Sequence, residues 1–388
     1  MSRIYELLKD LCPNGVEMHE LGTVCTFQRG RTITQKDAVI GDVPVIAGGQ
    51  QPSYYHNKAN RTGETISVSS SGAYAGFVNF WSIPVFLSDS FSVDPNSELL
   101  IPKYVFYYLK DNQERIHGTK KGSGVPHVHG SSISKFQIPV PPIEIQHEIV
   151  KTLDLFTELE AELEAELEAR KTQYTHYRDS LLRFEGKEVE WKTLGELGEF
   201  TRGKRFVKTD IVTAGVPCIH YGEMYTHYKI WAKETKSFLE PELAAKLRFA
   251  KKGDVIIVAA GETIEDIGQG VAWHGEEDVV IHDACFSFSH NMHPNYVSHF
   301  TQTDLFHSQI KRYISSGKIS SINAAGLSKA KIPVPPMEEQ IRIASILDNF
   351  HVLINDISVG IPAEIEGRRK QYEYYRNRLL TFKEVANG

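Results

Sequence analysis

The strongest constraint on the fold is an internal duplication that covers almost the whole chain. Motifs of the first half return in the second half in the same order. The sequence Ile-Pro-Val-Pro-Pro occurs at 138–142 and again at 332–336, and Gly63–Val68 matches Gly253–Val258. The chain therefore contains two copies of one unit, and each copy is a globular part followed by a long helical part.

The helical part of the first copy spans 141–185. It begins with two prolines and an early glutamate, which suit a helix N-terminus, and neither Gly nor Pro follows until Gly186. Apolar residues recur at steps of mostly three and four, which makes one face apolar. About forty helical residues form a rod roughly 60 Å long. The matching stretch 335–384 is expected to break near 360–362, because Pro362 cannot continue a helix through its own position.

Two apolar-striped helices in one chain bury their stripes well against each other, here as an antiparallel coiled coil. The alternative, that each packs only on its own globular part, leaves much of the rod uncovered. The residues expected to contact the other helix or a partner subunit are Leu153, Phe156, Leu159, Leu163, Leu167, Leu347, Phe350 and Leu353. This arrangement carries a pseudo-twofold axis. A short N-terminal helix at 3–11 is expected to continue the C-terminal one, so that the repeat is nearly circular.

The globular parts are expected to be mixed α+β domains. Short β-like runs punctuated by Gly, such as 65–69, 77–81 and 255–259, occur together with helical stretches that begin at Pro102 and Pro294. The second helical stretch is expected to cover 294–306. The sequence thus divides into a first globular part at 1–140, a helix at 141–185, a second globular part at 186–334 and a helix at 335–384.

Composition indicates a protein of a reducing cytoplasm. The 388 residues contain no apolar run of membrane length and no signal core, and the four cysteines form no C-x-x-C pair. A net charge of −6 is unfavourable for binding nucleic acid, but the six glutamates between 158 and 168 alone account for this charge. The charge therefore does not exclude DNA as a partner.

Two features of the globular parts suit nucleic acid. The offset between copies rises from 173 at Ile46/Ile219 to 190 at Gly63/Gly253, and both intervening segments are rich in Gln, Tyr and His. Such side chains hydrogen-bond to bases or stack on them, although a tolerated surface loop has a similar composition. Arg and Lys clusters at matched places suit phosphate contacts. The base-reading candidates are Gln50, Gln51, Tyr54, Tyr55, His220, Tyr221 and Tyr225, and the phosphate candidates are Arg29, Arg31, Lys120, Lys121, Arg202, Lys204, Arg205 and Lys318.

No motif for catalysis is found in the sequence. It lacks an Asn/Asp-Pro-Pro-aromatic motif, a glycine-rich cofactor loop after a strand and a phosphate-binding Gly-Lys-Ser/Thr sequence. His127 with His129, and His282 with His290 and His293, have no matching set in the other copy, so a shared metal site is not indicated. We expect no enzyme activity, metal site or cofactor site in this chain alone.

These motifs resemble those of a known family. Paired globular parts, each closed by Ile-Pro-Val-Pro-Pro-x-x-x-Gln and followed by a helix that ends in Gln-Tyr-x-x-Tyr-Arg, are similar to the DNA-specificity subunit of type I restriction-modification systems. The stretch 253–261 resembles that family's recognition domain. The resemblance covers nearly the whole chain and implies two target-recognition domains, each of which reads one half of a bipartite double-stranded DNA sequence.

The resemblance also implies partners. The paired helices would seat two methyltransferase subunits, which would bind S-adenosylmethionine, and restriction (nuclease/translocase) subunits are further candidates. Because the segments after Ile46 and Ile219 differ, the two half-sites should differ and the target should be asymmetric. Two other classes of function stay open: a coiled-coil scaffold that joins two protein-binding domains, and a metal-dependent hydrolase that uses the histidines.

A tandem Leu-Glu-Ala-Glu repeat at 159–166 suggests that the helix is a ruler for the gap between half-sites. Four residues lengthen a helix by about 6 Å and turn it by about 40° beyond a full turn, which nearly preserves the apolar face. The offset between copies changes from 194 at Phe156/Phe350 to 198 at Tyr174/Tyr372. We therefore expect the helix length to be adjustable in units of four residues.

Overall fold

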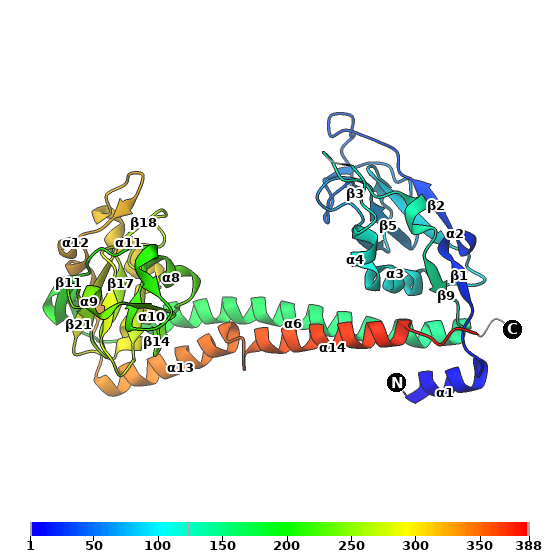
Figure 1. The fold of residues 1–388 in the computed structure, drawn as a ribbon. Coiled ribbons are helices and arrows are strands. Elements are labelled where there is room, and N and C mark those ends of the chain that lie inside the picture. Colours follow the sequence, from blue (N-terminus) through cyan, green and yellow to red (C-terminus); the bar gives the residue numbers. More distant parts are fainter. Residues whose placement is uncertain (1, 123, 386–388) are drawn as a thin grey trace. The chain divides into compact units, whose positions relative to one another are not determined.

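A computed structural model describes residues 2–122 and 124–385, which divide into two compact units (Figure 1). Unit 1 comprises Met1–Glu164 and Glu364–Gly388, and unit 2 comprises Ala165–Ala363. Both units combine helices with sheets, as the sequence predicts. No helix in the described ranges is long and apolar enough to cross a membrane.

Unit 1 contains a four-stranded antiparallel sheet in the order β2-β8-β5-β6, a three-stranded sheet β4-β3-β7 and the pair β1-β9. All five residues of β5 are buried, because α3 and neighbouring strands cover it. The strands are β1 (Met18–Glu20), β2 (Cys25–Arg29), β3 (Val43–Ile46), β4 (Tyr54–His56), β5 (Thr65–Ser69), β6 (Val78–Trp81), β7 (Phe86–Leu87), β8 (Ser90–Pro95) and β9 (Gln137–Pro139). The helices are α1 (Ser2–Leu11), α2 (Leu21–Val24), α3 (Pro102–Asp111), α4 (Gln113–His117) and α5 (Gly130–Ile133), with the first part of α6 (Ile143–Arg183) and most of α14 (Ile361–Leu380).

Unit 2 repeats this plan with larger sheets. Its two five-stranded sheets have the orders β11-β21-β17-β19-β14 and β12-β15-β13-β20-β16. The strands are β10 (Trp191–Thr193), β11 (Gly198–Arg202), β12 (Ile211–Val212), β13 (Val216–Ile219), β14 (Trp231–Ala232), β15 (Ser237–Leu239), β16 (Phe249–Ala250), β17 (Val255–Val258), β18 (Ala260–Gly261), β19 (Gly270–Trp273), β20 (Val279–Ile281), β21 (Cys285–His290), β22 (Ser320–Ser321) and β23 (Lys331–Pro333). The helices are α7 (Leu194–Leu197), α8 (Tyr221–Thr226), α9 (Pro241–Ala244), α10 (Pro294–Thr301), α11 (Asp304–Ile310), α12 (Ala324–Ser328) and α13 (Met337–Asn355), with 3₁₀ turns η1 (Lys208–Asp210) and η2 (Lys311–Tyr313).

One expected helix of unit 2 is divided. The stretch 294–306 forms α10 and the start of α11, with Gln302 and Thr303 between them. The Thr303 side chain accepts a hydrogen bond from the Phe306 backbone N–H at 3.2 Å, so Thr303 caps a new helix. An N-cap residue has non-helical backbone angles, and the prediction of one continuous helix was therefore wrong.

The repeated motif at the start of each long helix holds that helix to its globular part. In unit 1 the Gln146 side chain accepts a hydrogen bond from the Ile101 N–H at 2.9 Å and donates one to the Pro141 carbonyl at 2.8 Å. In unit 2 Gln340 accepts from the His293 N–H at 2.9 Å and donates to the Pro335 carbonyl at 2.8 Å. Both glutamines are buried. Their recurrence therefore has a structural cause, since each satisfies backbone groups at a buried junction.

The long helices pair within each unit. Figure 1 shows α14 alongside the first part of α6 in unit 1, and α13 alongside its later part in unit 2. Of the predicted pairing residues, Leu153 and Leu347 are fully buried and Phe156, Leu163, Leu167 and Phe350 are half-buried. Leu159 and Leu353 are 40% and 37% exposed, so helix pairing does not cover them, and contact with a partner subunit stays a prediction for both. Near Leu159 the contact is ionic instead, because Arg369 bridges Glu160 at 2.5 Å and Glu164 at 2.6 Å.

The second helical part is broken at residues 356–360, between α13 and α14, and Pro362 is the second residue of α14. The Asp356 carboxylate accepts hydrogen bonds from the N–H groups of Ser358 and Val359 and so stabilises this turn. The first copy is helical throughout the matching interval. The four extra residues of the second copy thus coincide with a turn, so this difference between the copies does not support a helix length that is adjustable in units of four residues.

The N-terminal helix α1 lies beside α14 and does not extend it. The guanidinium carbon of Arg378 is 5.6 Å from the centroid of the Tyr5 ring, and Arg3 lies 3.4 Å from Glu148 on α6. The residues after α14 instead approach the start of β1, where the Val16 N–H donates to the Lys383 carbonyl at 2.8 Å. The first and last described segments are therefore close, as a nearly circular repeat requires, but our expectation of one continuous helix was wrong.

Candidate nucleic-acid interface

The repeated Arg-Gly sequence marks a close backbone crossing in each unit. A Cβ atom on Gly30 would lie 2.4 Å from the Leu87 carbonyl oxygen, and one on Gly203 would lie 2.2 Å from the His282 carbonyl oxygen. No side chain fits at either place, so only glycine permits the crossing. The crossing places the cations around it, Arg29 and Arg31 in unit 1 and Arg202, Lys204 and Arg205 in unit 2, next to the turn before β8 or β21.

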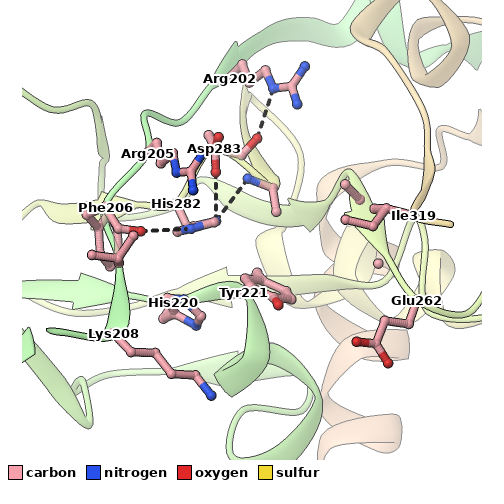
Figure 2. Close-up of a pocket in the computed structure, with 14 residues that line it drawn as sticks. Arg202, Arg205, Phe206, Lys208, His220, Tyr221, Glu262, His282, Asp283 and Ile319 are labelled. Atoms are coloured by element: carbon pink, nitrogen blue, oxygen red, sulfur yellow. Dashed lines mark hydrogen bonds and ion pairs between the residues drawn. The ribbon is translucent and has the colours of Figure 1, made fainter. Parts of the chain in front are cut away.

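In unit 2 this crossing borders a cavity of about 500 Å³ (Figure 2). Its charged lining residues are Arg202, Arg205, Lys208, Glu262 and Asp283, so cations outnumber carboxylates. The cavity has an aromatic part formed by Phe206, His220 and Tyr221, and Ile319 lies on the opposite side in the close-up. Cations beside aromatic and apolar side chains suit a ligand that presents both phosphates and bases.

Two of these cations also stabilise the fold. The Arg202 Nε–H donates to the Asp283 carbonyl at 2.9 Å, and the Lys204 ammonium donates to the Lys246 carbonyl at 2.8 Å. Both side chains are nevertheless exposed, as is that of Arg205. Arg202 and Arg205 both border the cavity, but Arg202 already donates to the Asp283 carbonyl, so Arg205 is the better candidate for a phosphate contact.

His282 organises the floor of the cavity. Its Nε2 lies 3.1 Å from the Phe206 carbonyl, and its Nδ1 accepts a hydrogen bond from the Ala284 N–H at 3.1 Å. A neutral ring protonated on Nε2 satisfies both bonds. Burial lowers the pKa of His282, although the adjacent Asp283 carboxylate opposes this shift. His282 therefore fixes the segment that carries Arg205 and Lys208.

The predicted base-reading residues of unit 2 have mixed positions. His220 is buried, and its ring accepts the Gly222 N–H at 3.3 Å as the N-cap of α8. Burial, followed by the nearby His282, lowers the pKa of His220. Tyr221 is half-buried and lines the cavity, whereas the side chain of Tyr225 lies outside the described residues. Tyr221 is thus better placed for base contact than His220.

The extra residues of the second copy do not form a loop. The segment between Ile219 and Gly253 contains α8, β14, β15, α9 and β16. Strand β14 pairs with β19 and forms an edge of one five-stranded sheet, and β16 forms an edge of the other. The alternative interpretation of this segment as a tolerated surface loop was therefore wrong for the second copy, because these residues complete both sheets.

In unit 1 the shorter segment carries β4 and stays largely at the surface. Gln50 and Gln51 are exposed, and Tyr55 is 57% exposed. Tyr54 instead donates its hydroxyl hydrogen to the Ile33 carbonyl at 2.6 Å, which anchors the loop after Arg31. Arg29 and Arg31 are both exposed near that loop. Gln50, Gln51 and Tyr55 remain available for contacts, whereas Tyr54 supports the loop.

The remaining predicted cations lie at matching hairpins. Lys121 and His127 exchange two backbone hydrogen bonds of 2.9 Å, and Ser315 and Ser321 exchange bonds of 2.8 and 3.0 Å. Lys120 is half-buried near the first hairpin, and Lys121 and Lys318 are exposed. Both hairpins pair with the segment that follows the central strand β5 or β17. The predicted correspondence between the two basic segments is thus reproduced by the backbone pairing.

The cavity contains residues that sequence reasoning missed as binding candidates, namely Phe206, Lys208, Glu262, His282, Asp283 and Ile319. These residues come from four separate segments of the chain, which no local motif joins. The duplication offered one signal, since Asp89 and Asp283 match and both follow the strand beside the crossing. Within the described ranges, no group of three or more His, Cys, Asp or Glu residues is arranged to hold a metal ion.

Comparisons with known proteins agree on one family. The family model described as Type I restriction modification DNA specificity domain matches residues 13–169 and 186–367. The EcoR124I/EcoR124II type I restriction enzyme specificity subunit of Escherichia coli is 35% identical over 316 residues, which cover 75% of this chain and 73% of that protein.

Two solved structures share the fold. One is the S subunit of a type I restriction-modification system from M. genitalium, with a TM-score of 0.57 and 16% identity over 94% of this chain and 96% of that one. The other comes from work on complex assembly and conformational transition of the type I R-M system, with a TM-score of 0.63 and 17% identity over 95% of this chain and 98% of that one.

Proposed function

Because this chain belongs to the family of type I restriction-modification DNA specificity subunits, we propose that each of its two globular parts reads one half of a bipartite DNA sequence. Members of this family supply sequence specificity and are not the catalytic subunits. The proposal further assigns the globular parts of units 1 and 2 to different half-sites. It is supported most directly by the cation-rich cavity of unit 2 and by the matching glycine crossing in unit 1.

The charge distribution supports different binding roles for the globular parts and the helices. The acidic stretch 158–168 is confined to helix α6, while the cations that border the cavity belong to the globular part. DNA binding requires cations to replace the counterions of phosphates, so the globular parts are the suitable surface. The acidic helix suits protein partners, and we propose that the paired helices seat two methyltransferase subunits.

The proposed partners determine where the chemistry occurs. S-adenosylmethionine would bind to the methyltransferase subunits, and restriction subunits would join through the same assembly. Under this proposal the chain alone neither methylates nor cleaves DNA. Purification with a methyltransferase subunit, followed by measurement of the mass of the complex, should give two methyltransferase subunits per chain. Methyl transfer by the isolated chain would refute the proposal.

A further inference from the structure

The matching hairpins at 121–127 and 315–321 each place a branched apolar residue at the surface. Val125 and Ile319 are separated by 194 residues, which is also the offset between Asp89 and Asp283. Val125 is 56% exposed and Ile319 is 62% exposed. The neighbouring tip residues differ between the copies, since the first hairpin has Gly124 where the second has Lys318. An exposed apolar side chain is therefore the shared property of the two tips.

Packing does not account for this exposure. The residues that anchor the hairpins, Val128 and Ile322, are almost fully buried, with exposed fractions of 1% and 3%. Their backbone N–H groups donate to Ser70 and Ala259 at 2.9 Å, which ties each hairpin to its central sheet. Val125 and Ile319 thus lie on hairpins that are fixed to the domain, but their side chains lie outside the core. Burial of these side chains by a ligand would be favourable.

The surroundings of Ile319 indicate what covers it. It borders the same cavity as Arg202, Arg205 and Lys208, and Figure 2 shows it across the cavity from Arg205. If these cations bind the phosphates of DNA, the Ile319 side chain faces the base edges in the groove between the two DNA strands. In the major groove the thymine 5-methyl is the apolar group among the hydrogen-bonding donors and acceptors of the bases.

We propose that Ile319 in unit 2 and Val125 in unit 1 are specificity-determining residues, each of which contacts a thymine methyl group in the half-site read by its own domain. This inference rests on the proposed function. It adds an apolar contact, at one matched position in each domain, to the polar and ionic contacts proposed for that domain.

The test uses the full chain assembled with its methyltransferase subunits and duplexes that carry the target found by methylation mapping. Each thymine of the target is replaced in turn by uracil, which lacks the methyl group but keeps the base-pairing groups. Dissociation constants are measured for the unaltered complex and for the Ile319→Ala, Val125→Ala and Ile357→Ala variants. Ile357 is 86% exposed on the turn between α13 and α14 and serves as the matched control.

For the unaltered complex, one uracil in each half-site should weaken binding about fourfold, which corresponds to ~0.8 kcal/mol for one methyl group. Ile319→Ala should weaken binding to the thymine duplex and abolish the effect of uracil in one half-site alone. Val125→Ala should do the same in the other half-site, and Ile357→Ala should change nothing.

The inference would be overturned if Ile319→Ala and Val125→Ala weakened binding to thymine and uracil duplexes by equal factors at every position. A target with no thymine in either half-site would also overturn it. A failure of the proposed function would give a different result from a failure of this inference. In that case the unaltered complex itself would not distinguish its target from a scrambled duplex.

Discussion

The ring of Phe156 stacks on that of Tyr375 in unit 1, with centroids 5.4 Å apart and planes inclined by 26°. Unit 2 contains the matching contact, in which Phe350 stacks on Tyr177 at 5.5 Å and 28°. Phe350 is the repeat of Phe156, and Tyr375 is the repeat of Tyr177. Each aromatic pair therefore joins a residue near the start of one helical part to one near the end of the other, as antiparallel pairing of two repeats requires.

The first prediction concerns the length of α6. One further Leu-Glu-Ala-Glu unit after Glu166 lengthens the helix by about 6 Å and nearly preserves its face. We expect both half-sites to stay the same and the unread gap to grow by one or two base pairs, because one base pair of DNA rises about 3.4 Å. Methylation mapping of cells that contain the variant measures the gap.

A two-residue insertion at the same place is the control for this prediction. It rotates the later part of α6 by about 200°, moves the apolar face away from its partner and should abolish modification. If the four-residue variant stays active with an unchanged gap, the helix is not a ruler.

The second prediction concerns phosphate contacts. Arg205→Ala in unit 2 and Arg31→Ala in unit 1 should weaken binding to all duplexes by similar factors. Each should also reduce the slope of log K against log salt by about 0.9 if one phosphate contact is lost. Fluorescence anisotropy at several salt concentrations measures both effects. Lys252→Ala, which removes an exposed cation paired with Glu276 at 2.5 Å, should leave the slope unchanged. A loss confined to the specific target would contradict the phosphate assignment.

The third prediction concerns the unequal segments of the two copies. Replacing residues 47–62 with the matching segment of a relative of different specificity should change one half-site and leave the other intact. The reason is that this segment lies entirely within the globular part of unit 1. The native target should be asymmetric, because the second copy has extra strands and helices here. A palindromic target, or a swap that alters both half-sites, would count against separate reading.

The fourth prediction concerns acid stability. His299 is fully buried, its Nε2 lies 2.8 Å from the Asp348 carboxylate, and its Nδ1 lies 3.1 Å from the Tyr174 hydroxyl. Burial lowers the pKa of His299, although Asp348 opposes the shift. Burial likewise lowers the pKa of His290 and of His351 from 6.5 to about 4. These histidines stay neutral in the folded protein at a pH where the unfolded chain binds protons.

The free energy of unfolding should therefore fall as the pH decreases from 6.5 towards 4, by at most about 1.4 kcal/mol per pH unit for each shifted histidine. Thermal unfolding at pH 7 and pH 5 measures the loss, and hydrogen exchange should locate it in unit 2. His351→Gln should reduce the pH dependence. A midpoint that is constant between pH 7 and 5 would contradict this assignment.

The sequence predicts the parts of the fold that rest on periodicity and duplication. The apolar spacing around Leu153 gives the long helix, and the recurrence of Gln146 as Gln340 marks equivalent junctions, which the structure explains by matching hydrogen bonds. The cavity could not be predicted as a site. Lys208, His282 and Ile319 lie far apart in the chain. They meet because the crossing at Gly203 packs on residues 281 and 282, and because the hairpin at 315–321 pairs with β18.

The segment after Ile219 shows a second limit of sequence reasoning. Its strands have only two or three residues each, too few for a clear alternation of apolar and polar positions. Their stability comes from pairing with distant strands, as Trp231 does with Ala272. Composition alone therefore suggested a reading loop where the structure has sheet edges.

The most direct test is a genome-wide methylation map of cells that express the methyltransferase subunit with and without this chain. With the chain, we predict modification at a single sequence made of two different half-sites separated by a gap of fixed length. Without the chain, modification of that sequence should disappear. The same modified sequence in both maps, or a target without a gap, would contradict the claim that this chain supplies bipartite DNA specificity.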